Sequence, residues 1–123
     1  MKHNIVKMVG AMTFFALLGT ACAQLNPKFE ESLNNALDAQ KEAFQTCYEQ
    51  TLKKDQNARG EMELKLEFTP NSKKVDQAQI TQSDIKDGTM KKCVTKAAKS
   101  IETTELPGTW VKGQYTLDFA VNQ

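Results

Sequence analysis

Three cysteines and a single histidine are the residues with the most distinctive chemistry in this 123-residue chain. Cys47 and Cys93 lie in the body of the chain, and Cys22 lies close to its start. A pair of cysteines in an exported protein usually forms a disulfide, whereas in a reducing compartment it stays as two buried thiols. The cellular compartment therefore decides which chemistry applies, and the first residues of the chain indicate that compartment.

The start of the chain has the pattern of a secretory signal peptide. Two lysines and a histidine precede an apolar run, Met8–Leu18, and the small residues Ala21 and Ala23 follow it. The run is too short for a permanent membrane helix, although a retained anchor is the alternative. We therefore expect residues 1–23 to be removed, a periplasmic location, and a disulfide between Cys47 and Cys93.

Cys22 leaves a second route of export open. The letters LLGTAC resemble a bacterial lipobox, in which the cysteine becomes the lipidated first residue, but Gly19 stands where that motif usually has leucine. We favour release into the periplasm, because Ala21 and Ala23 fit the ordinary cleavage rule. The alternative is a lipoprotein anchored through Cys22, and only then would the membrane be a partner.

Charge and composition exclude several functions. Removal of residues 1–23 takes away two lysines and the histidine and lowers the formal net charge from +1 to −1, which argues against nucleic acid as a partner. Without histidine, the common catalytic triads and zinc sites are excluded, and no glycine-rich phosphate loop is present. Glu61 and Glu63 form a carboxylate pair, which we interpret as solubilising surface. We expect no enzyme activity, no cofactor and no metal.

The remaining chain divides into elements by its hydrophobic periodicity. Asn26 and Pro27 begin a helical pattern that continues to Lys54, with apolar residues every three or four positions and Gln40 filling one gap. Its first part, residues 24–42, is predicted to be a helical extension that either covers the domain or stands off as a stalk. Residues 43–123 form the predicted domain.

Two strands and a helix follow, and a third strand ends the chain. Gly60–Phe68 alternates strictly, and residues 75–83 form a weaker strand with a bulge expected between Val75 and Ala78. A helix capped by Thr89 should present apolar residues through Ile101, and residues 111–121 alternate again. The predicted fold is α+β: an αββαβ two-layer domain with a three-stranded antiparallel sheet, order 2-1-3, covered on one face by two helices. The third strand is then an open edge.

This pattern resembles the TonB C-terminal-domain superfamily, and within it the cysteine-paired AgmX/PglI C-terminal domain. The resemblance covers about residues 43–121, most of the mature chain. It is carried by CYEQTL, Gly60, an alternating strand, a turn, a weaker strand that ends near Ser83, KKCV and a late proline. The chain departs from the family pattern at the hairpin turn, which reads NSKK, and at Leu106, where an aromatic residue is common. It also has no proline-rich spacer, which puts an energy-transducing role in doubt.

The resemblance implies a function in protein binding. Domains of this superfamily take a partner strand at the edge of the third strand, here through the backbone of Gln114, Thr116, Asp118 and Ala120. We therefore expect a non-catalytic, strand-accepting module of the bacterial cell envelope, with an envelope protein of unknown identity as its partner.

Two aromatic residues have alternative roles, and so does the first helix. Tyr48 is expected at the border of the core, with an interface contact as its alternative. Trp110 is expected to cover the core, with a partner-binding anchor as its alternative. The competing function is an envelope assembly protein, including a homodimer, that associates through the helical segment 29–37.

Overall fold

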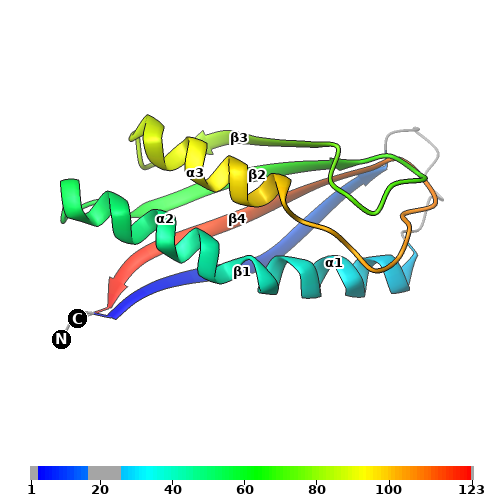
Figure 1. Ribbon diagram of the computed structural model, residues 1–123, viewed down its shortest axis with the longest axis horizontal. Coiled ribbons are helices and arrows are strands. Elements are labelled where there is room, and N and C mark those ends of the chain that lie inside the picture. The colour runs from blue at the N-terminus through cyan, green and yellow to red at the C-terminus, as the bar shows by residue number, and fades with distance from the viewer. Residues whose placement is uncertain (1–2, 17–25, 123) are drawn as a thin grey trace.

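The structure of this protein is a computed structural model that describes residues 3–16 and 26–122. It consists of three helices and a four-stranded antiparallel sheet, with the helices packed as one layer against the sheet (Figure 1). The elements, in chain order, are β1 (His3–Ala16), α1 (Pro27–Ala39), α2 (Lys41–Lys54), β2 (Gly60–Phe68), β3 (Gln77–Ser83), α3 (Gly88–Lys99) and β4 (Val111–Asn122).

The predicted α+β class and strand order are confirmed. β2 is paired with β3 on one side and with β4 on the other, so the three predicted strands lie in the order 2-1-3. Along β2 and β4 the side chains alternate between buried and partly exposed, because successive residues of a strand point to opposite faces. The buried set faces the helices, and the polar set forms the uncovered face of the sheet.

A fourth strand, which the sequence analysis missed, lies beside β4. β1 pairs antiparallel with β4 from His3 opposite Asn122 to Ala16 opposite Val111, with a register shift between Val9 and Thr13. The expectation of an open β4 edge is therefore wrong for the full chain. The segment is rich in β-branched and aromatic residues, which favour strands, and β4 offers it an unpaired row of backbone groups.

The long helical pattern is two helices instead of one. α1 ends at Ala39, and Gln40 separates it from α2, which begins at Lys41. The apolar side of α1 is buried: Phe29, Leu33 and Leu37 belong to the same core cluster as the strands. α1 therefore packs against the rest of the domain and does not stand off as a stalk.

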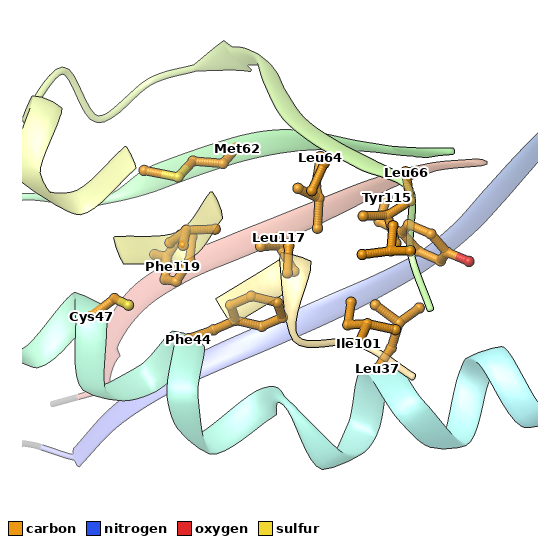
Figure 2. Packing of buried hydrophobic residues seen from close by; sticks show 14 of the residues in the cluster. Leu37, Phe44, Cys47, Met62, Leu64, Leu66, Ile101, Tyr115, Leu117 and Phe119 are labelled. Atoms are coloured by element: carbon orange, nitrogen blue, oxygen red, sulfur yellow. The ribbon is translucent and has the colours of Figure 1, made fainter. Parts of the chain in front are cut away.

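The hydrophobic core fills the space between the helices and the sheet. Figure 2 shows side chains of the first two helices facing those of β2 and β4. The ring of Phe29 meets the ring of Phe68 edge-on at 5.3 Å, and the ring of Tyr48 lies 5.2 Å from that of Phe119. Because α1 and α2 both contribute, the layer of helices extends along the length of the strands.

A disulfide joins Cys47 of α2 to Cys93 of α3, as predicted. The two Cα atoms are 5.7 Å apart, and the bond closes a loop of 46 residues that contains the β2–β3 hairpin. In the chain-entropy model a loop of this length stabilises the folded state by about 4 kcal/mol. The bond therefore fixes the two helices to each other above the sheet.

Two local predictions are wrong in their position. The irregularity in the hairpin lies where Glu63 pairs with Gln82 and Leu64 with Ile80, so the extra residue is Thr81 instead of one between Val75 and Ala78. The cap of α3 is Asp87, whose Oδ1 accepts a hydrogen bond from the Thr89 N–H at 3.0 Å.

Within the described residues, no helix has both the length and the apolar character needed to cross a membrane.

Candidate functional site

The candidate site is the side of β4 that faces away from β2. On its inner side β4 pairs with β2 over the whole of that strand, from Gly60 opposite Phe119 to Phe68 opposite Val111. On its outer side it pairs with β1. The same strand thus pairs with the hairpin on one side and with the N-terminal segment on the other.

The four predicted edge residues lie together on the uncovered face of the sheet. Gln114, Thr116, Asp118 and Ala120 are half-buried, and they alternate with core residues such as Leu117 and Phe119. Thr116 lies opposite Glu63 of β2 and opposite Val9 of β1. Their side chains are therefore accessible from the open face, while their backbones occupy the middle of a four-stranded sheet.

Trp110 lies directly before β4 and is exposed. Its relative exposed area is 54%, and Leu106 in the preceding loop is 44% exposed. The expectation that Trp110 covers the core is therefore wrong. The loop is held by the Gly108 N–H, which donates to the Pro70 carbonyl at 3.1 Å. An exposed indole just before the first residue of β4 fits the alternative prediction, in which Trp110 is a partner-binding anchor.

Tyr48 is a core residue and lies deeper than its predicted place at the border of the core. Its side chain is fully buried, and its hydroxyl donates a hydrogen bond to the Ala58 carbonyl oxygen at 2.7 Å. Burial raises the pKa of the hydroxyl, the nearby carboxylate of Asp118 also raises it, and the positive charge of Arg59 opposes the shift. Tyr48 therefore connects α2 to the turn before β2 and is not available as an interface contact.

Tyr115, on the core face of β4, carries an unusual buried hydroxyl. The oxygen has no hydrogen-bond partner among the described residues. Burial raises the pKa of this hydroxyl far above its ordinary value, and the charge of Glu30 on α1 adds to the increase. An unpaired buried hydroxyl reduces the stability of a fold, so this residue is a structural weak point beneath α1.

The polar residues of the uncovered face form one small charge network. Glu67 of β2 forms two ion pairs through its Oε1 atom. Lys112 Nζ of β4 lies 3.3 Å from this oxygen, and Lys65 Nζ lies 3.7 Å from it. At the other end of the sheet, Glu61 and Asp118 are opposite each other in the register. Like charges directly across a strand pair repel, but Lys7 of β1 lies opposite Asp118 on its other side and supplies a positive charge at that register position.

The carboxylates that could do chemistry lie in two places, on the uncovered face of the sheet and in a hollow beside α3. Glu61 is exposed and Glu63 half-buried on the uncovered face. A hollow of about 330 Å³ between the end of α2 and the start of α3 contains Asp55, Asp84 and Asp87 in its lining. Within residues 3–16 and 26–122, no group of acidic, cysteine or histidine side chains is arranged to hold a metal ion.

One structural contact escaped the sequence analysis. Gly60 has a φ of +132°, and its neighbour Glu61 exchanges two hydrogen bonds with Asp84. The Glu61 N–H donates to Asp84 Oδ2 at 3.0 Å, and the Asp84 N–H donates to the Glu61 carbonyl at 2.8 Å. A Gly before an alternating run was the only available signal. This contact fixes the open end of the β2–β3 hairpin.

Comparisons with known proteins add no assignment. No family model matches the chain, and neither the curated proteins nor the solved structures contain a match. The resemblance to the TonB C-terminal-domain superfamily therefore stays a prediction. Cys22 and the expected cleavage site at Ala21 and Ala23 lie outside the described residues, so lipidation and cleavage stay predictions as well.

Proposed function

We propose that this protein is an exported, non-catalytic binding module of the bacterial cell envelope that accepts a partner strand at the outer edge of β4. The observation that supports the proposal most is the pairing of residues 3–16 with that edge. This pairing is antiparallel and spans nearly all of β4, so the edge has the geometry to take an extended segment.

The proposal also explains why the segment that pairs there is the predicted signal peptide. Cleavage after Ala23 would remove β1 and leave the outer backbone groups of β4 without a strand. A strand from another protein would then restore the hydrogen bonds that β1 makes in the full chain. Before cleavage, β1 occupies the site, which would keep the binding edge closed until export is complete.

Trp110 gives the proposed site an anchor. Val111 is the β4 residue opposite Ala16, so a strand that follows the path of β1 ends beside the exposed indole. Backbone pairing supplies affinity with little sequence preference, whereas a large aromatic side chain adds a contact that depends on the partner's residues. Trp110 is thus the residue we expect to contribute most to partner selectivity.

The experiment is photo-crosslinking in the native cell with a photoreactive amino acid at Thr116, followed by mass spectrometry. Thr116 lies in the middle of β4 with its side chain on the uncovered face, so the substitution leaves the core intact. We expect a single envelope protein cross-linked through an extended segment, and a mature N-terminus beyond residue 23. Cross-links only to residues 3–16 of the same chain would contradict the proposal. The matched control places the same group at Gln50, on the exposed side of α2.

A further inference from the structure

A second edge of the sheet, formed by β3, lies on the side opposite β1. β3 pairs only with β2 among the described residues, so its outer side has no strand partner. Its sequence, QAQITQS, contains neither proline nor a charged residue, although these are the usual means of blocking an exposed edge. The irregularity at Thr81 interrupts the regular pairing of β3 with β2.

A groove runs between this edge and α3, and its walls are basic. The groove has a volume of about 500 Å³, and its floor is formed by Ala78, Gln79 and Ile80 of β3. Its other lining residues belong to α3 and include no carboxylate: Lys91, Lys92, Thr95, Lys96 and Lys99. Asp76 and Asp84, which flank β3, do not line it.

The four lysines are not explained by the needs of the helix itself. Lys96 and Lys99 lie in the last turn of α3, where the helix dipole favours a positive charge, but Lys91 and Lys92 lie near its beginning, where it does not. α3 contains no acidic residue that could pair with them, and none of the four makes an ion pair within the described part of the chain. Together they form an unneutralised row beside an open strand edge.

We propose that this groove binds an acidic, extended segment of a partner protein as an additional strand on β3. Because side chains of a strand alternate, every second side chain of the added segment would face α3. Carboxylates at those positions would meet the lysine row, while the backbone pairs with β3. The combination of an open strand edge, an uncharged floor and lysine-lined walls favours a peptide over a nucleic acid or a lipid surface, because neither of these would need a strand edge.

The test uses the full chain and a synthetic peptide long enough to cover β3, with glutamate alternating with valine. Binding is measured by fluorescence anisotropy at low and at moderate salt. We expect saturable binding that weakens as salt increases, because Lys92, Lys96 and Lys99 are exposed and salt screens their attraction for carboxylates. A peptide with glutamine in place of every glutamate should bind at least about tenfold more weakly, since its carboxylates are missing.

Two comparisons separate the proposal from its competitors. The double variant Lys92→Glu and Lys96→Glu should lose binding, whereas Lys53→Glu and Lys54→Glu in α2, with the same change in net charge, should retain it. A glutamate peptide methylated at alternate backbone nitrogens keeps its charges but cannot pair as a strand, so it should also fail to bind.

Three results would overturn the proposal. One is equal loss of binding in both double variants, which indicates only bulk charge. Another is unchanged binding of the methylated peptide, which would exclude strand addition. The third is binding of vesicles that contain phosphatidylglycerol, sensitive to Lys92→Glu and Lys96→Glu, without binding of the peptide, which would assign the lysines to a membrane surface.

Discussion

At the scale of single residues, the tightest constraint lies at Gly60. A Cβ at this position would lie 2.5 Å from the Cβ of Asp84, and the φ of +132° disfavours any other residue. We expect Gly60→Ala to lower the free energy of unfolding by about 1–3 kcal/mol, because both the backbone and the contact with Asp84 must shift. Urea denaturation measures the change.

The matched control for this prediction is Gly88→Ala. A Cβ on Gly88, the first residue of α3, meets nothing within 4 Å. Alanine is favoured over glycine in a helix, so the free energy of unfolding should stay the same or rise by up to about 1 kcal/mol. If the two variants unfolded at the same urea concentration, the close approach of Gly60 to Asp84 would not be a real constraint.

The two buried tyrosines should respond oppositely to removal of their hydroxyls. Tyr48→Phe leaves the Ala58 carbonyl without its hydrogen bond, and we expect a loss of about 1 kcal/mol. Tyr115→Phe removes a hydroxyl that has no partner in the described part of the chain, so stability should stay the same or increase. Chemical denaturation at neutral pH distinguishes them. A clear loss in Tyr115→Phe would reveal a partner for that hydroxyl.

The same tyrosines predict how stability depends on alkaline pH. Burial raises the pKa of both hydroxyls above the ordinary value of 10.0. The unfolded state therefore releases these protons first, so the stability is complete below pH 10 and decreases as the pH rises further. We expect this decrease to be shallower in Tyr115→Phe than in the unaltered protein, measured by urea denaturation at several pH values. Parallel curves for the two proteins would contradict it.

At the scale of elements, substitutions in α1 distinguish a helix that belongs to the core from one that associates with another protein. Leu33 is fully buried in the core, and Asn34 beside it is exposed. We expect Leu33→Ala to cost about 2–5 kcal/mol of stability, the usual range for a leucine removed from a core, and Asn34→Ala to change it little. Both variants should sediment like the unaltered protein. Unchanged stability with altered sedimentation in Leu33→Ala would restore the assembly reading.

The elements also show how far the sequence predicts this structure. β2 and β4 alternate so strictly that their faces and their pairing follow from the pattern alone, and the paired helices follow from Cys47 and Cys93. The break at Gln40 falls in the one gap of the apolar spacing, between Leu37 and Ala43, but a single polar residue on the apolar side does not by itself end a helix. The exposure of Trp110 depends on the path of one loop, and the position of the bulge depends on the register of two strands.

The N-terminal segment was harder to predict for a physical reason. An apolar run rich in β-branched and aromatic residues fits a signal peptide and a buried strand equally well, because both are selected for hydrophobicity. Only the presence of an unpaired neighbour, β4, distinguishes them.

The lysine groove beside β3 could not be predicted from the sequence either. Lys91, Lys92, Lys96 and Lys99 look like an ordinary solvated helix face until the hairpin places an open edge next to them.

At the scale of the whole molecule, the outer sides of β3 and β4 differ in whether another described strand pairs with them. The β3 edge is open, whereas the β4 edge is covered by a strand from the same chain. A covalently attached strand competes with any free one at a high effective concentration, so the full chain should be a poor acceptor at β4. Residues 24–123 retain the disulfide and the other three strands, and should accept a strand there readily.

The last prediction follows from this competition. A synthetic peptide with the sequence of residues 3–16 should bind the chain 24–123 and increase its resistance to urea, since a ligand that binds only the folded state stabilises it. The same peptide should bind the full chain at least about tenfold more weakly, because β1 already occupies the edge. A scrambled peptide of the same composition is the control for simple hydrophobic adhesion, and circular dichroism checks that 24–123 is folded. Equal binding to both chains would place the peptide elsewhere on the molecule, and failure to bind a folded 24–123 chain would mean that β4 does not accept a separate strand.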